Sequence, residues 1–274
     1  MFYLFFFIAA AAVPILNIFY PVLKQPYTWW LIPVIVVAVF SALVVLFIFV
    51  LLISILSVNY KKTKPAVSAY FRFLIDNALK MAVPLLRVKI HTTGKELLPE
   101  NVRFLLVCNH LNDIDPAVIM HEIPEAELCF VAKDEICTKL TFVARAIHKL
   151  GGLFINRDNN REAAKTIVNA TKLIKEDKAS VGIFPEGYTS KTGDLQDMRN
   201  GAFKIAIKAE CPVVICTVCG TKEAVKHLLV KKNHIYFDVL KVLLADEVKA
   251  LSTAEIGDMA HTLMSENPQK YKKG

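Results

Sequence analysis

The first sixty residues are an almost unbroken run of apolar side chains. Lys24 is the only charged residue among them, and it separates an apolar run at Phe2–Leu23 from a second at Trp29–Ser57. A helix needs roughly 20 apolar residues to cross the hydrocarbon core of a bilayer. The pattern therefore predicts that residues 1–60 form two apolar helices that anchor the chain in a membrane, either as two spans or as a kinked hairpin within one leaflet.

A cleaved secretory leader is the alternative for the first apolar run. Such a leader begins with positive charge and is followed by polar mature chain, and the sequence has neither feature. Cytoplasmic flanks of membrane spans carry an excess of Lys and Arg. Because Lys61, Lys62, Lys64 and Arg72 follow the second run, we expect the rest of the chain to lie on the cytoplasmic side of the cell membrane, with its cysteines as free thiols.

Residues 61–90 are predicted to hold an amphipathic linker helix. Apolar residues recur at helical spacing from Val67 to Leu85, while Arg72, Asp76 and Lys80 mark another face. Such a helix either packs on the following domain or lies along the membrane surface.

Short apolar runs alternate with helical patterns over residues 91–274. This alternation indicates an α/β domain. The expected strands are 103–107, 128–132, 152–155, 180–184, 213–218 and 235–242, and the expected helices are 116–121, 140–150, 161–175, 201–209 and 253–267.

Three polar residues suited to chemistry come directly after expected strands. They are His110, Arg157 and Glu186. Loops at strand ends converge on one crevice in open α/β sheets, so we expect these residues to share a site.

His110 precedes Asp115 by five residues in the stretch NHLNDIDP. A regular helix would place the two side chains about 140 degrees apart, so only a turn brings them together. In a turn, Asp115 would fix the tautomer of the imidazole and raise its basicity, as in general-base pairs. Two alternatives stay open: Asp115 caps a helix that begins at Pro116, or the histidine and the aspartates bind a metal.

Four blocks of sequence together resemble the membrane lysophosphatidic acid acyltransferase family (1-acylglycerol-3-phosphate O-acyltransferases). They are NHLNDIDP at 109–116, FVAKDEI at 130–136, GGLFINR at 151–157 and FPEGYTS at 184–190. The blocks occur in the family's order, which makes the set more specific than any one block. The resemblance implies the glycerolipid acyltransferase fold, in which helices flank a mixed sheet, behind the two-helix anchor.

The resemblance also implies roles for individual residues. It makes His110 the general base and Asp115 its orienting partner, and it assigns binding of the acceptor and its phosphate to Lys133, Arg157, Glu186 and Gly187. The implied reaction transfers an acyl chain from the thioester of coenzyme A or acyl carrier protein to the sn-2 hydroxyl of lysophosphatidic acid, making phosphatidic acid without metal or other cofactor. We therefore expect lipid partners and no nucleic acid, despite a net charge of +8.

The chain departs from the family pattern at Tyr188 and Thr189, where Thr-Arg is usual. One expected cation is missing there, and Lys191 and Arg199 are the candidates to replace it. The departure leaves another lysolipid or glycerol 3-phosphate open as the acceptor. A non-catalytic membrane-tethered lipid-binding protein and a metal-dependent hydrolase are the remaining alternatives.

Cysteines and a basic patch complete the candidate chemistry. Cys108 lies two residues before His110 and is an alternative thiol nucleophile. Cys216 and Cys219 have the spacing of zinc ligands but lack a second pair, and their apolar surroundings predict a buried strand. The lysines of residues 222–232 form either a solvated surface or a docking site for anionic lipid or an acidic carrier protein.

Overall fold

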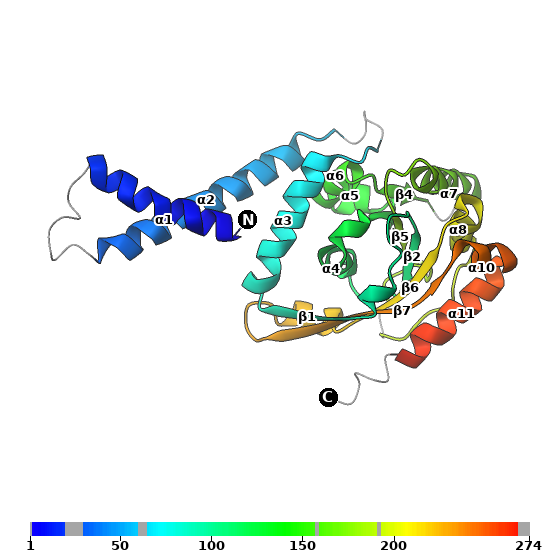
Figure 1. Ribbon diagram of the computed structural model, residues 1–274. Coiled ribbons are helices and arrows are strands. Elements are labelled where there is room, and N and C mark those ends of the chain that lie inside the picture. The colour runs from blue at the N-terminus through cyan, green and yellow to red at the C-terminus, as the bar shows by residue number, and fades with distance from the viewer. Residues whose placement is uncertain (1, 20–29, 60–64, 157–158, 191–192, 268–274) are drawn as a thin grey trace. The chain divides into compact units, whose positions relative to one another are not determined.

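The computed structural model describes residues 2–19, 30–59, 65–156, 159–190 and 193–267. The chain forms two compact units, Met1–Val58 and Asn59–Gly274. Figure 1 labels the helices and strands of both units.

The first unit consists of two apolar helices, α1 (Phe2–Phe19) and α2 (Leu31–Leu56), which pack on each other. The rings of Phe5 and Phe47 meet edge to face, with 6.4 Å between their centroids. Of the described helices, α2 alone is long and apolar enough to cross a bilayer. The expected two-helix anchor is therefore only partly supported, and the end of the expected first span, residues 20–23, lies outside the described residues.

The second unit is built on a sheet of seven strands in the order β1-β7-β6-β2-β5-β3-β4. Five neighbouring strands, β6, β2, β5, β3 and β4, are parallel, whereas β7 runs antiparallel to β6 and β1 runs parallel to β7. The sheet is therefore mixed, as expected. The strands are β1 (Val88–Thr93), β2 (Leu105–Cys108), β3 (Cys129–Lys133), β4 (Leu153–Ile155), β5 (Val181–Ile183), β6 (Val213–Cys219) and β7 (Asn233–Leu243).

Because of these strand directions, one edge of the sheet contains both carboxyl and amino ends of strands. The carboxyl ends of the five parallel strands lie there together with the amino ends of β7 and β1. We call it the carboxyl edge. The loops that carry candidate polar residues leave the sheet from this edge.

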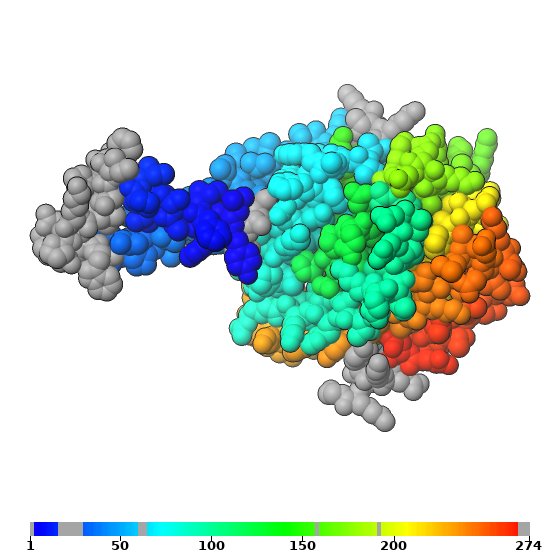
Figure 2. All heavy atoms as spheres, viewed as in Figure 1, coloured from blue at the N-terminus to red at the C-terminus, as the bar shows by residue number. Residues whose placement is uncertain are grey.

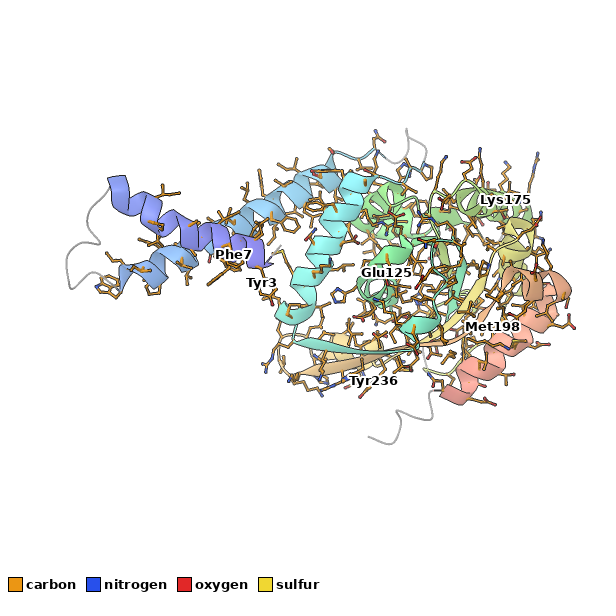
Figure 3. The ribbon with its side chains drawn as sticks, viewed as in Figure 1. Tyr3, Phe7, Glu125, Lys175, Met198 and Tyr236 are labelled. Carbon is orange, nitrogen blue, oxygen red and sulfur yellow. The ribbon has the colours of Figure 1, made fainter. Side chains whose placement is uncertain are left out.

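Helices cover both faces of the sheet (Figure 1). A core between one face and its helices contains Phe203 and Ile256, both fully buried. The helices on this face are α7 (Asn160–Lys175), α8 (Lys204–Ala209), α10 (Ala245–Ala250) and α11 (Thr253–Glu266). The other face is covered by α3 (Ala69–Leu85) and α4 (Asp115–Glu122), and the shorter helices are α5 (Ile136–Lys139), α6 (Thr141–Lys149) and α9 (Thr221–Lys226). Side chains fill the layers between sheet and helices (Figure 3).

The strands expected from apolar runs form close to their expected positions, because strands buried on both faces have continuous apolar sequence. β1 was not expected, since Lys89 and His91 interrupt its apolar pattern at the edge of the sheet. The boundary expected at residue 91 lies inside this strand. The short helices α5, α9 and α10 were also not expected.

Helix α3 belongs to the second unit and packs there against β1 and α4. It begins after Ser68, whose Oγ accepts a hydrogen bond from Phe71 N at 3.5 Å. Phe71 and Leu74 are buried as the periodicity predicted, whereas Arg72, expected on the polar face, is also buried. The structure thus supports packing of this helix on the domain, while Tyr70 on the same helix stays exposed.

Candidate active site

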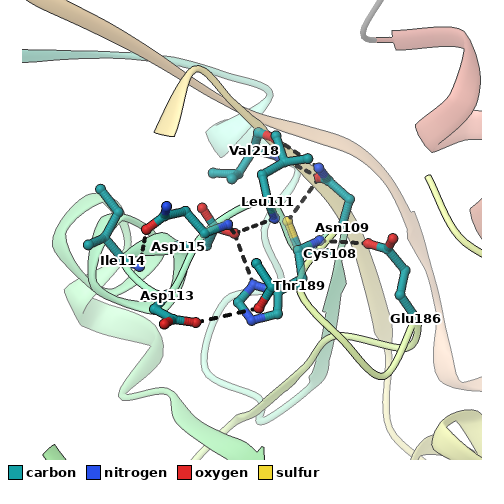
Figure 4. A network of polar contacts seen from close by, with 11 residues as sticks. Cys108, Asn109, Leu111, Asp113, Ile114, Asp115, Glu186, Thr189 and Val218 are labelled. Atoms are coloured by element: carbon teal, nitrogen blue, oxygen red, sulfur yellow. Dashed lines mark hydrogen bonds and ion pairs between the residues drawn. The ribbon is translucent and has the colours of Figure 1, made fainter. Parts of the chain in front are cut away.

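His110 and Asp115 meet in a turn that follows β2 at the carboxyl edge. His110 Nδ1 lies 3.0 Å from Asp115 Oδ2, and the same oxygen accepts hydrogen bonds from Leu111 N at 2.7 Å and Asn112 N at 2.8 Å (Figure 4). The Asp115 side chain is fully buried, whereas that of His110 is 16% exposed. The chain therefore bends after His110 as the pairing required.

The carboxylate of Asp115 turns away from helix α4. Ile114 is the N-cap of α4, and no side-chain cap hydrogen bond is present. Asp115 is instead the first residue of the helix and accepts from backbone N–H groups that precede it. Helix capping is thus not the role of this side chain, and among the described residues no cluster of three or more His, Cys, Asp or Glu side chains is suited to a metal ion.

The contacts of the carboxylate determine the tautomer of His110. An ionised carboxylate only accepts hydrogen bonds, so the proton of a neutral imidazole lies on Nδ1 and is donated to Asp115 Oδ2. Nε2 then carries a lone pair and has no partner among the described residues. The ring is fixed at one nitrogen and able to take a proton at the other.

Asn109 fastens this turn to β6. Its Nδ2 donates to Val218 O at 2.9 Å, and its Oδ1 accepts from Val218 N at 2.8 Å. The side chain is buried and reproduces the pairing that a strand backbone would make. A role for Asn109 was not predicted, because spacing alone does not distinguish a buried asparagine from one in a turn.

Glu186 fastens the same turn from the loop after β5. Its Oε1 accepts from His110 N at 2.6 Å, and its Oε2 accepts from Gln196 N at 2.9 Å. Burial raises the pKa of this carboxyl, while the two backbone N–H groups lower it. Since both oxygens bind backbone and the residue is buried, Glu186 has the geometry of a positioning residue and not that of a phosphate ligand.

Gly187 forms a tight turn after Glu186. Its φ is 88°, a left-handed conformation that glycine adopts readily. Its N–H donates to Phe184 O at 3.1 Å, so the expected donor to a ligand is already used within the turn. Farther along the loop, Ser190 N donates to His110 O at 2.8 Å, which places residues 187–190 beside the histidine.

A stack of aromatic rings supports the imidazole from one side. The ring of His110 lies 4.1 Å from that of Phe184 at an interplanar angle of 13°, and Phe184 in turn stacks on Phe130 of β3 at 5.5 Å. A side chain at Gly182 would overlap the Phe130 ring, so the glycine makes room for the stack. This support was not expected from the sequence.

Two cations flank the Tyr188 ring on the exposed side of the loop. Lys133 Nζ lies 5.5 Å and Arg199 Cζ 5.4 Å from the ring centroid, distances typical of cation–π contacts. The backbone N–H of Arg199 donates to Pro185 O at 2.9 Å, and its guanidinium donates from Nη2 to the Tyr188 hydroxyl at 3.5 Å. Neither cation forms an ion pair with a carboxylate in the described part of the chain. The expected phosphate ligand Arg157 and the alternative cation Lys191 lie outside the described residues.

Cys108 and Cys216 are buried in the sheet. Cys108 is fully buried, its Sγ lies 3.6 Å from Asn109 Oδ1, and burial raises the pKa of its thiol well above the ordinary value. The same holds for the pKa of Cys216, which is likewise buried in the sheet. A protonated, buried thiol is a poor nucleophile and a poor metal ligand.

Residues 89–219 match a family model described as Acyltransferase. The 1-acyl-sn-glycerol-3-phosphate acyltransferase of Borreliella burgdorferi is 28% identical over 60% of this chain and 68% of its own length. A probable enzyme of the same name from Mycoplasma pneumoniae is 26% identical over 66% of this chain and 70% of its own.

The fold is similar to a solved structure as well. The crystal structure of the 1-acyl-sn-glycerophosphate (LPA) acyltransferase PlsC from Thermotoga maritima matches 75% of this chain and 81% of that chain, with a TM-score of 0.60 and 22% identity. The resemblance expected from the sequence motifs is thereby confirmed. Residues 89–219 belong to the acyltransferase family.

Proposed function

We propose that this chain transfers an acyl group from a thioester of coenzyme A or acyl carrier protein to the sn-2 hydroxyl of 1-acylglycerol 3-phosphate, making phosphatidic acid. The observation that carries the proposal is the geometry of His110. Asp115 fixes its Nδ1–H at 3.0 Å, which leaves the lone pair of Nε2 unused on a side chain that is 16% exposed. The names of the curated relatives and the order of the four motifs support the same reaction.

Proton transfer accompanies each bond change in the proposed reaction. Nε2 of His110 takes the proton of the hydroxyl as the hydroxyl oxygen attacks the thioester carbonyl carbon. The carbon–oxygen bond forms, the carbon–sulfur bond then breaks, and the imidazolium returns the proton from Nε2 to the departing thiolate. Asp115 keeps the proton on Nδ1 throughout and stabilises the positive charge of the imidazolium. The reaction needs no enzyme-bound acyl intermediate.

Lys133 and Arg199 supply positive charge for the phosphate of the acceptor in this proposal. Neither is neutralised by a carboxylate among the described residues, and both lie against Tyr188, on the loop that contacts His110. A guanidinium offers a planar pair of donors to phosphate oxygens, and an ammonium acts as a point charge. Arg199 thus takes the place of the cation missing at Thr189. We retain Arg157 as a further phosphate ligand on the motif alone.

The N-terminal unit holds the enzyme at the cytoplasmic face of the cell membrane in this proposal. The apolar length of α2 and the lysines at 61, 62 and 64 support that placement. Because acceptor and product are both lipids, anchoring raises the local concentration of the substrate around the site.

Full-length protein in phospholipid vesicles, supplied with labelled acyl-coenzyme A or acyl carrier protein and a panel of acceptors, tests the proposal. We expect label in phosphatidic acid when the acceptor is 1-acylglycerol 3-phosphate. His110→Ala should lower turnover by at least about a hundredfold while the fold is retained. Preference for an acceptor that lacks phosphate would remove the roles of Lys133 and Arg199, and full activity of His110→Ala would remove the mechanism.

A further inference from the structure

The turn between α9 and β7 holds two apolar side chains in solvent. Leu229 is 60% exposed and Val230 is 76% exposed, the largest value for a large apolar residue described in the second unit. We call residues 227–232 the tip. Exposed apolar residues next to each other on a protruding turn indicate contact with another molecule or with lipid.

The tip has a defined shape set by hydrogen bonds. The buried side chain of Asn233 donates from Nδ2 to His227 O at 3.1 Å and to Lys231 O at 2.9 Å. Val230 N donates to His227 O at 3.2 Å, and Leu229 adopts a φ of 68°. A left-handed conformation is unfavourable for a residue with a Cβ. The fold therefore keeps Leu229 in an unfavourable backbone conformation and leaves the side chains of both Leu229 and Val230 exposed.

Positive charge surrounds the tip. Lys231 and Lys232 are exposed and form no ion pair with a described carboxylate. Arg87 Nη1 donates to Val230 O at 3.4 Å, and Figure 2 shows the orange spheres of this segment beside the turquoise ones of the β1 region. The only acidic residue in 222–232 is Glu223, which pairs with Lys226 and His227. The surface is thus apolar at its summit and cationic around it.

The tip projects from the carboxyl edge, which also carries the candidate active site. β6 ends at Cys219 and β7 begins at Asn233, so the connection between them leaves the sheet where the loop after β2 holds His110. In the strand order, this connection lies to one side of β2. On the other side, the segment after β3 exposes Leu140 by 47% and Phe142 by 39%. Exposed apolar side chains therefore lie on both sides of the histidine along one edge.

We propose that the tip is a membrane-docking element of the catalytic unit. Leu229 and Val230 enter the interfacial region of a bilayer, and Lys231 and Lys232 contact anionic lipid headgroups. Apolar residues rimmed by Lys and Arg bind membranes in this way, because apolar burial and attraction to anionic lipid add. Docking turns the carboxyl edge, with His110, toward the lipid.

The chemistry of the tip favours a bilayer over an acidic carrier protein. An acidic carrier protein would bind the lysines, but it would not explain why two neighbouring apolar side chains are exposed beside them. The interfacial region of a bilayer accommodates such apolar side chains. The inference goes beyond the proposed function and relies on it only for the presence of a lipid substrate. Membrane docking is measured without catalysis, so the docking proposal and the proposed function can fail independently of each other.

A fluorescent label at residue 230 of the full-length chain tests the proposal. Cys137→Ser and Cys219→Ser remove the two partly exposed native thiols, and Val230→Cys receives an environment-sensitive dye. Val102→Cys is the matched control, because Val102 is also apolar and 50% exposed but precedes β2 at the opposite edge. In vesicles of phosphatidylcholine and phosphatidylglycerol with spin-labelled lipid, we expect a blue shift and quenching at 230, at least about threefold stronger than at 102.

Reversal of charge at the tip provides the second arm. One lysine near an anionic surface changes partitioning by about fivefold, so Lys231→Glu with Lys232→Glu should largely remove the quenching at 230. The matched control places the same changes at Lys175, labelled in Figure 3, and Lys178, which lie before β5 at the opposite edge and should leave quenching unchanged.

Equal quenching at 230 and 102 in vesicle-bound protein would overturn the proposal. A shift at 230 that requires an acidic carrier protein and not vesicles would overturn it as well, in favour of that partner. Strong quenching at 230 in a chain that transfers no acyl group would support docking while it overturned the proposed function.

Discussion

The substitution Asp115→Asn tests whether the charge of Asp115 supports catalysis, because it removes that charge but can keep the hydrogen bonds of the turn. Asp115 Oδ2 accepts three hydrogen bonds, from His110 Nδ1 at 3.0 Å, Leu111 N at 2.7 Å and Asn112 N at 2.8 Å. An amide has the same shape as a carboxylate, and its oxygen can accept the same bonds. The substitution therefore removes the negative charge and leaves the turn with little steric reason to change.

The loss of that charge matters most when His110 carries a second proton. A hydrogen bond to a charged group contributes about 1.5–3 kcal/mol and one between neutral groups about 0.5–1.5 kcal/mol. The attraction between the imidazolium and the buried carboxylate is lost in addition. We expect kcat/KM to fall at least about a hundredfold, equivalent to about 2.7 kcal/mol of transition-state stabilisation.

Glu186→Gln is the matched control for Asp115→Asn. Glu186 is also a buried carboxylate that accepts N–H groups of the active-site loops, but it does not touch the imidazole. Initial rates with labelled acyl donor and thermal unfolding should be measured for both variants. We expect Glu186→Gln to lower the free energy of unfolding by about 1–3 kcal/mol and to keep kcat/KM within about tenfold of the native chain. Equal rate losses in the two variants, or an Asp115→Asn enzyme with more than about a third of native kcat/KM, would refute the orienting role.

Further predictions concern the acceptor, the cysteine and pH. Lys133→Gln and Arg199→Gln should each raise the KM of the acceptor about tenfold, the effect of one charge-assisted bond, with the KM of the donor unchanged; a change in donor KM alone would contradict this. Tyr188→Leu should raise acceptor KM only about two- to fivefold, through lost cation–π contacts. Cys108→Ala should retain turnover, and thiol alkylation that inactivates the native chain but spares this variant would contradict the buried role. Because burial raises the pKa of Glu186 above its ordinary value of 4.5, the folded chain keeps that proton to higher pH than the unfolded chain, so stability falls as pH rises from 4.5 through the folded pKa. Glu186→Gln should remove that part of the decline in melting temperature.

The sequence predicted every strand of the sheet except β1, which lies at one edge. Leu105–Cys108 is apolar throughout, and Val213–Cys219 is apolar except for the buried Thr217, because helices cover both faces of the sheet there. β1 has mixed polarity and pairs with β7, a partner about 145 residues away in the chain. The periodicity of a segment does not show which distant strand it pairs with. The residues of β1 therefore fell at the expected boundary between the linker helix and the α/β domain.

The sequence predicted the pairing of His110 with Asp115 and left its support unspecified. Helical geometry excluded contact within a helix, but spacing alone left helix capping and metal binding open, and the pairing followed from the resemblance of the motif. The contacts of Asn109 with β6 and of Glu186 with Gln196 depend on how separate loops pack. Spacing within one segment cannot predict them. For the same reason the sequence indicated a missing cation at Thr189 but not the placement of Arg199 beside Tyr188.

The candidate site divides into a fixed part and a variable part. Asn109, Asp115 and Glu186 are buried and bind backbone groups of the loops around His110, so a change at any of them leaves a buried donor or acceptor without its partner. Lys133 and Arg199, by contrast, each contact the exposed ring of Tyr188 and are not part of that buried network. Substitutions there change the charge presented to an acceptor without moving the imidazole. The replacement of the family's Thr-Arg pair at residues 188 and 189 falls on the loop of the variable part, so we expect it to alter the recognition of the headgroup and to preserve the proton-transfer geometry of His110.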